Sequence, residues 1–317
     1  MKKYDAKLVR RINEEALSRK ESFSTASLVG KLESEFPSFS KDFLSDCVEQ
    51  TLSLNDDIFV SYGEHMGISH FSPKAVFMKG AEFCSTPSGT EIRKGFFVPG
   101  DVFSVFIPEG KDIQKVKLLY LNKGIELKSC PKKLSLAEFK SKFPFSSAIS
   151  PKGKNTEISA FEMKDFYSKT GFEDGDTILF RVEDYDNMIL SFRRKSAVER
   201  RDTRAIKKWC QKMENSMVKI LEELGDFVGF REQIEEIFLS EPDLLKNPPI
   251  SFEEFLKASN SVSLVKHDGK NILWSNRVDQ DESADAVDEG MISISKGATG
   301  LMGDILEDIG LTILPDL

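Results

Sequence analysis

Apolar residues in the first 72 positions recur at helical spacing and then in short extended runs. Over residues 4–20 the apolar positions are separated by three, four or one residues, with charged residues between them, which is typical of an amphipathic helix. Segments 25–36 and 41–52 show similar spacing, each behind a serine or threonine that can cap a helix. The runs 58–60 and 67–71 are rich in strand-forming residues. The pattern predicts three helices followed by a β-hairpin.

This order of elements resembles a winged helix-turn-helix domain, which would occupy a first domain of residues 1–74. The resemblance implies that the third helix enters a groove of DNA. The exposed positions of that helix include Lys41, Ser45 and Gln50. The segment 61–65 would be the wing.

A short pattern occurs twice in the central domain, residues 75–195. Segments 95–106 and 171–182 each contain a Gly-Phe pair, then a Gly-Asp step, then an apolar run. A turn that leads into a buried strand has this composition. We therefore predict a small duplicated β-barrel, in which the glycine of each Gly-Asp step has positive φ and the aspartate accepts backbone N–H bonds. The four turn residues are Gly100, Asp101, Gly175 and Asp176.

The repeated aspartates have an alternative interpretation as a catalytic pair. Aspartic proteases carry Asp-Thr/Ser-Gly, whereas here a glycine precedes each aspartate, so the structural interpretation is favoured. The duplicated, strand-rich pattern resembles the pseudobarrels of B3-type and AbrB-type DNA-binding proteins, most closely in residues 171–182, and this resemblance again implies nucleic-acid binding.

Further elements are predicted around this repeat and after it. Strands are expected at 116–121, 124–127 and 187–192, helices at 136–143 and 162–169, and a polar connection at 146–155. In a third domain, 196–278, two helices, a capping box from Ser251 to Glu254 and an Asp268-Gly269 hairpin again follow winged-helix order. Residues 279–317 are expected to form an acidic linker and an apolar tail, 301–314, that docks on this chain or a partner. The predicted fold class is α+β and multidomain.

Charge is distributed unevenly along the chain, whose net charge is −8. Residues 214–317 hold 22 acidic and 8 basic side chains, whereas residues 193–212 hold nine basic and two acidic ones. The basic segment is the best candidate for contact with the phosphates of DNA or RNA. Its predicted contacts are Arg193, Arg194, Lys195, Arg200, Arg201, Arg204, Lys207 and Lys208. The alternative is a solvated helix face that pairs with the acidic third of the chain.

Motifs for catalysis and for cofactor or metal binding were not found. The sequence has no phosphate-binding glycine loop, no HExxH and no GxSxG, and its three histidines and four cysteines do not form metal-ligand spacings. We therefore predict no catalytic residues, no cofactor and no metal. No apolar stretch approaches the about 20 residues of a membrane span, and the dispersed cysteines favour a reducing, cytoplasmic location.

These observations favour a non-catalytic nucleic-acid-binding or transcription-associated regulator. A protein–protein adaptor that uses winged-helix modules without contacting nucleic acid is the alternative. An enzyme with an unrecognised active site is a third hypothesis, because a fold alone does not determine function.

Overall fold

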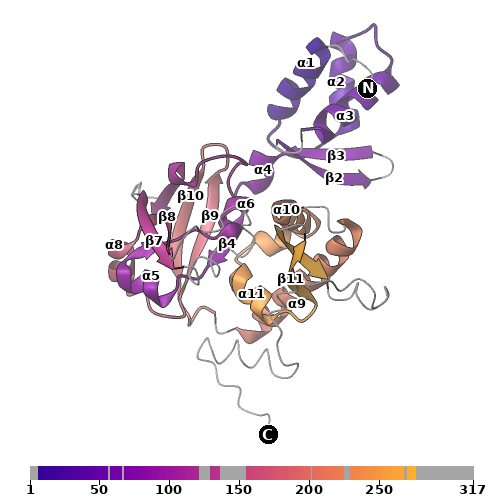
Figure 1. The fold of residues 1–317 in the computed structure, drawn as a ribbon. Coiled ribbons are helices and arrows are strands. Elements are labelled where there is room, and N and C mark those ends of the chain that lie inside the picture. The colour runs from indigo at the N-terminus through magenta and orange to yellow at the C-terminus, as the bar shows by residue number, and fades with distance from the viewer. Residues whose placement is uncertain are drawn as a thin grey trace. The chain divides into compact units, whose positions relative to one another are not determined.

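The computed structural model of the chain is of the α+β class, as predicted (Figure 1). It describes residues 6–275 apart from 56–57, 66–67, 121–128, 136–154, 201, 225–228 and 268–269. The chain forms two compact units. The first comprises 1–81 with 183–187, and the second comprises 82–182 with 188–317.

The N-terminal unit contains the three predicted helices and the predicted hairpin. Its elements are α1 (Ala6–Leu17), β1 (Phe23–Ser24), α2 (Thr25–Glu35), α3 (Lys41–Ser53), β2 (Phe59–His65), β3 (Ile68–Pro73) and α4 (Lys74–Met78). Ser24 and Ser40 cap α2 and α3 by accepting backbone N–H bonds. The strands form an antiparallel sheet in the order β1-β3-β2. The predicted wing needs a correction, because residues 61–65 belong to β2, which pairs with β3 as far as His65 and Ile68.

The apolar stripes predicted from the spacing meet in one core. Leu8 and Ile12 of α1 pack with Leu28 of α2 and with Leu44 and Val48 of α3, and all five are buried. These positions recur every three or four residues along each helix, so they lie on a single face. The spacing of apolar residues therefore determined both the helices and the direction that each faces.

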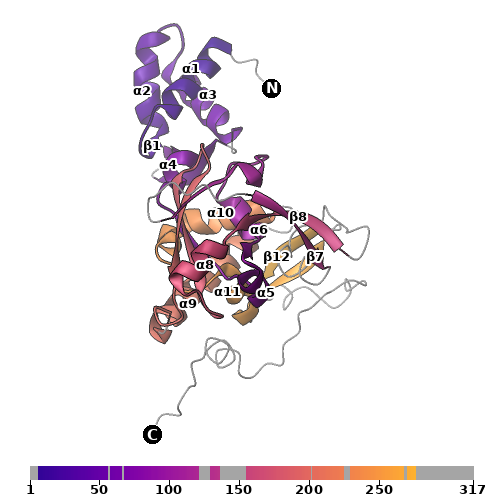
Figure 2. The same cartoon turned by 90° about the vertical axis from the view of Figure 1, so that its left-hand side faces the viewer.

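Seven strands of the second unit form two sheets. They are β4 (Glu82–Ser85), β5 (Phe96–Phe97), β6 (Lys117–Tyr120), β7 (Ser129–Ser135), β8 (Asn155–Glu162), β9 (Thr177–Asp184) and β10 (Ile189–Lys195). One sheet has the order β4-β9-β10-β6 and the other β5-β8-β7, in which β7 and β8 lie side by side (Figure 2). The short helices here are α5 (Gly89–Lys94), α6 (Asp101–Val105) and α8 (Lys164–Thr170), with a 3-10 turn, η1 (Ile113–Lys115). Phenylalanines fill the core, for example Phe83 stacked on Phe106 with ring centroids 4.0 Å apart.

The two copies of the repeated pattern fold differently, which corrects half of the prediction. The second copy is the predicted turn and strand, with Gly175 at a φ of 87° before β9. In the first copy, Gly100 has a φ of −86° and precedes helix α6, which begins at Asp101. The apolar run 102–106 buries Val102, Phe103, Val105 and Phe106. Over five residues this pattern fits helical spacing as well as a buried strand.

A different part of the pattern is shared by both copies. The Gly-Phe pairs follow α5 and α8, and both glycines are left-handed C-caps, Gly95 with a φ of 70° and Gly171 with a φ of 59°. Gly95 also lies close to α8, because a Cβ at this position would be 2.7 Å from the Cβ of Lys164. The repeated pattern therefore corresponds to the C-terminal ends of two helices, α5 and α8, and to one turn that leads into strand β9.

Gly95→Ala is expected to destabilise the protein by at least about 2 kcal/mol, because it adds a contact with the backbone of α8 to the strain of positive φ. Gly110→Ala is the matched control, since Gly110 has a φ of 67° and a Cβ there would meet nothing within 4 Å. The control should lose only about 1 kcal/mol. Chemical denaturation measures both, and equal losses would contradict the close approach of α8.

The last part of the second unit is helical and ends in a hairpin. It contains α9 (Thr203–Leu224), α10 (Phe230–Ser240), the 3-10 turn η2 (Pro242–Leu245), α11 (Phe252–Ala258), β11 (Val262–His267) and β12 (Lys270–Ser275). The capping box from Ser251 to Glu254 is confirmed. His267 pairs with Lys270, so a two-residue connection joins the strands, as Asp268-Gly269 predicted.

Several predictions fall on residues outside the described ranges. They are the strand at 124–127, the helix at 136–143, the linker at 279–290 and the tail at 301–314. Of the others, strand 116–121 and helix 162–169 are confirmed as β6 and α8.

Candidate nucleic-acid interface

The basic segment 193–212 runs from the end of β10, through a turn, into the first turns of α9. Asp202 begins the helix, because its Oδ1 accepts hydrogen bonds from the backbone N–H groups of Arg204 and Ala205, both at 3.0 Å. The segment therefore combines two environments, a strand end packed on the protein and a helix whose outer face meets solvent.

At the strand end, two of the predicted phosphate contacts are bound by the protein itself. The Nε of Arg194 lies 2.7 Å from Oδ2 of Asp176. Lys195 is buried, and its Nζ donates to Oδ1 of Asn247 at 2.9 Å and to the carbonyl oxygen of Pro248 at 2.8 Å. Burial lowers the pKa of Lys195. Lys195 is therefore held inside the fold and is not exposed for the predicted contact with phosphate.

Asp176 has the structural role that the turn interpretation predicts. Its Oδ2 accepts from the backbone N–H of Glu173 at 2.8 Å, and its Oδ1 accepts from that of Ala197 at 2.9 Å. With Arg194 as counter-ion, this buried carboxylate joins the turn before β9 to the turn before α9.

In the turn itself, Arg200 is also part of the fold. Its guanidinium is buried, with Nη2 2.6 Å from Oε1 of Glu254 and Nη1 donating to the carbonyl oxygen of Gly175 at 2.7 Å. Like Lys195, Arg200 is held inside the fold and is not exposed for the predicted contact with phosphate. Arg193 is half-exposed and pairs with Glu199 at 2.9 Å, and Arg201 lies outside the described residues.

The helical part of the segment is different. Arg204, Lys207 and Lys208 are exposed on α9, and their side chains make no hydrogen bond or ion pair with the part of the chain that the structure describes. Ile206 and Met213 are buried, so these cations lie on the solvent side of the helix. We call Arg204, Lys207 and Lys208 the basic face of α9.

The basic face occupies positions of α9 at which cations destabilise the helix. Its members are three and four residues apart, so like charges are neighbours on the helix surface. They also occupy the first two turns, where the helix dipole is positive. Each effect costs some tenths of a kcal/mol, so the stability of α9 does not explain why these three cations are placed together.

Helix α3 of the N-terminal unit presents a different surface. Lys41 and Gln50 are exposed and Ser45 is half-exposed, as predicted. Asp42 and Asp46 are exposed beside them, and Glu49 is half-exposed. Carboxylates repel phosphates, so the charge of α3 does not favour the contact that the winged-helix resemblance implies.

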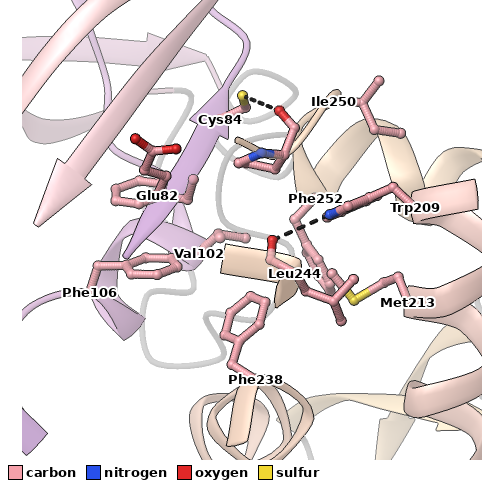
Figure 3. A pocket seen from close by; sticks show the side chains of 12 residues that line it. Glu82, Cys84, Val102, Phe106, Trp209, Met213, Phe238, Leu244, Ile250 and Phe252 are labelled. Atoms are coloured by element: carbon pink, nitrogen blue, oxygen red, sulfur yellow. Dashed lines mark hydrogen bonds between the residues drawn. The ribbon is translucent and has the colours of Figure 1, made fainter. Parts of the chain in front are cut away.

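The second unit also contains a small cavity between the β-sheet and the helices. Its volume is about 20 Å³, and it is lined mainly by apolar side chains that include Val102, Phe106, Met213 and Phe238 (Figure 3). A space of this size holds about one water molecule. Cys84, at its border, donates from Sγ to the carbonyl oxygen of Pro248, and burial raises the pKa of this thiol to about 11. The cavity is a packing defect and offers no room for a substrate.

The described residues contain no cluster of histidine, cysteine and carboxylate side chains that could hold a metal ion. Among the helices that the structure describes, none is sufficiently long and apolar to cross a membrane. Cys47, Cys84 and Cys210 are buried, and none of the three forms a disulfide. No protein-family model, curated protein or solved structure matches this chain.

Proposed function

We propose that this chain is a non-catalytic nucleic-acid-binding regulator that contacts the phosphate backbone through the basic face of α9. The observation that carries the proposal is the contrast within one segment. Lys195 and Arg200 are buried with protein partners, whereas Arg204, Lys207 and Lys208 are exposed and have no partner among the described residues. Cations that stabilise no part of their own fold, gathered on one surface, fit a polyanionic ligand.

The arrangement of elements supports this function. The N-terminal unit has three helices, then a hairpin, and a sheet in the order β1-β3-β2. Residues 203–275 again place helices before a hairpin. Both resemble winged-helix modules, and the charges favour a phosphate contact through α9 over one through α3. The buried cysteines Cys47, Cys84 and Cys210, which form no disulfide, support a reducing compartment, and we place the protein in the cytoplasm.

Replacing Arg204, Lys207 and Lys208 by glutamine is expected to weaken binding and to reduce its salt dependence. Each phosphate contact adds about 0.9 to the slope of log K against log salt for a DNA duplex, so three lost contacts lower the magnitude of the slope by about 2.7. Fluorescence anisotropy with labelled duplex and single-stranded probes, at salt concentrations from about 50 to 300 mM, measures the slope.

The matched control changes three other exposed lysines to glutamine, Lys169, Lys219 and Lys246. Each of them pairs with a carboxylate on its own helix or turn, so the net charge changes equally without touching the basic face. This control should keep the wild-type slope. Equal losses in both triple variants would assign the binding to net charge alone, and a wild-type chain that binds neither probe would end the proposal.

A protein–protein adaptor remains the second candidate, because of a feature of the N-terminal unit. Leu54 is 78% exposed and Ile58 41% exposed, directly after the acidic α3. Exposed apolar residues beside carboxylates suit a partner with apolar and basic side chains. Purification with and without nuclease separates the two candidates, since only a nucleic-acid-binding chain loses 260 nm absorbance after the nuclease step.

A further inference from the structure

We infer that α9 lies in the major groove of duplex DNA, where Gln211 and Asn215 read base edges. This inference rests on the proposed function. The inference extends the proposed function by naming the form of nucleic acid and the residues that would give sequence preference. Neither residue is among the phosphate contacts that the sequence predicted.

The two amides continue the basic face of α9 along the helix. Gln211 and Asn215 are exposed, and both lie on the side opposite the buried Ile206, Met213 and Met217. Neither amide bonds to any described residue. From Arg204 to Asn215 the face extends over about 16 Å at 1.5 Å per residue, which corresponds to about five base pairs at 3.4 Å each.

This face carries no negative charge. The only carboxylate between Thr203 and Glu222 is Glu214. The Oε1 of Glu214 accepts from Oγ of Ser259 at 2.7 Å and from the N–H of Ser261 at 3.1 Å. Glu214 is therefore directed toward the hairpin side of the helix. A phosphate that approaches the outer face of α9 meets cations and neutral amides over three turns.

The chemistry of the two amides matches a base edge. A side-chain amide has a donor and an acceptor, and it can bind N6 and N7 of adenine through both. Gln211 and Asn215 are four residues apart and thus about 6 Å apart along the helix, close to the rise of two base-pair steps. Arg204 precedes Gln211 by about two turns on the same side, and Lys208 precedes Asn215 by the same spacing, at a distance suited to the flanking phosphates.

Duplex DNA fits this face better than RNA does. The major groove of B-DNA admits an α-helix, whereas that of A-form RNA is too narrow to be read by side chains. Single strands are bound chiefly by stacking on aromatic rings. The aromatic residue in this part of α9 is Trp209, which is half-buried. Its Nε1 donates to the carbonyl oxygen of Leu244 and its ring packs against Phe255, so it is engaged within the fold.

The test is selection of binding sites from a randomised DNA duplex library by the full chain. The wild-type protein is expected to enrich a motif with at least one fixed adenine. The double variant Gln211→Ala and Asn215→Ala should bind random duplex with the wild-type salt slope but lose the motif. The preference at each affected position should fall by about 10- to 100-fold, which is the range for a bidentate base contact. Alanine is the best helix former, so α9 is retained, and circular dichroism checks this.

Gln50→Ala is the control, because it removes an exposed amide from α3, the other candidate groove helix. It should leave the motif unchanged. Salt-dependent binding without any enriched motif, a motif that survives in the double variant, or tighter binding to an RNA duplex or a single strand would overturn the inference while the proposed function stands. A wild-type chain that binds no nucleic acid refutes the proposed function, and this inference with it.

Discussion

Arg200→Met is expected to lower the free energy of unfolding by about 3–5 kcal/mol, because it breaks a buried ion pair and leaves one partner behind. The Arg200 side chain is fully buried, and its Nη2 lies 2.6 Å from Oε1 of Glu254. Without Arg200, this carboxylate loses its counter-charge, and the carbonyl oxygen of Gly175 loses its donor at 2.7 Å. Urea denaturation followed by tryptophan fluorescence measures the loss.

Two further variants isolate the cause. Adding Glu254→Gln removes the unpaired charge and keeps an oxygen for the N–H of Ser251, which Oε2 of Glu254 binds at 2.8 Å, so this double variant should recover much of the loss. Arg193→Met breaks an exposed pair with Glu199 and should cost at most about 1 kcal/mol. A loss as small as this for Arg200→Met would contradict the buried ion pair.

As Arg200 shows, the sequence could only partly separate the exposed cations of the basic segment from the buried ones. The spacing of Arg204, Lys207 and Lys208 relative to Ile206 and Met213 is visible in the sequence and predicts an outward face. Asn247, a partner of Lys195, and Glu254, a partner of Arg200, lie more than 50 positions further along the chain. Only the packing of α11 and the loop before it against the strands brings these groups together. Charge density therefore indicated the region, but the fold decides which of its cations remain exposed.

Gln211 and Asn215 were missed for a related reason. Gln211 lies near the end of the basic segment and Asn215 lies beyond it, and an uncharged amide adds nothing to the charge by which that segment was recognised. The signal was nevertheless present in the sequence, because the apolar stripe of α9 places both amides opposite Ile206 and Met213. Extending the outward face along the whole helix would have found them.

Among the strands, β7 and β8 were missed because their composition is polar. Strand β7 contains Pro131 followed by two lysines, and β8 begins within the segment assigned as a polar connection. Proline removes a ladder donor and is confined to edge strands. The structure places β7 at the edge of the sheet β5-β8-β7, where this sequence is tolerated. Helix α6 was missed because its short apolar run fits the spacing of a helix as well as that of a buried strand.

Gln233→Leu is expected to destabilise the second unit by about 2–4 kcal/mol, because it leaves two buried backbone groups without partners. Gln233 lies on α10 and is fully buried. Its Nε2 donates to the carbonyl oxygen of Leu273 at 3.2 Å, and its Oε1 accepts from the N–H of Leu273 at 3.1 Å. The side-chain amide thus forms the two hydrogen bonds that a neighbouring strand would form. It provides partners for both backbone groups of Leu273 at this edge of β12.

Two measurements test this role of Gln233. Denaturation of the variant gives the loss of stability, and amide hydrogen exchange at Leu273 should become faster by more than the global change explains, because its N–H has lost its acceptor. Gln211→Leu is the matched control, since the same substitution at an exposed position of α9 should change stability by at most about 0.5 kcal/mol. If both variants were equally stable, or if Leu273 kept its protection in Gln233→Leu, the amide would not be what closes the edge of the hairpin.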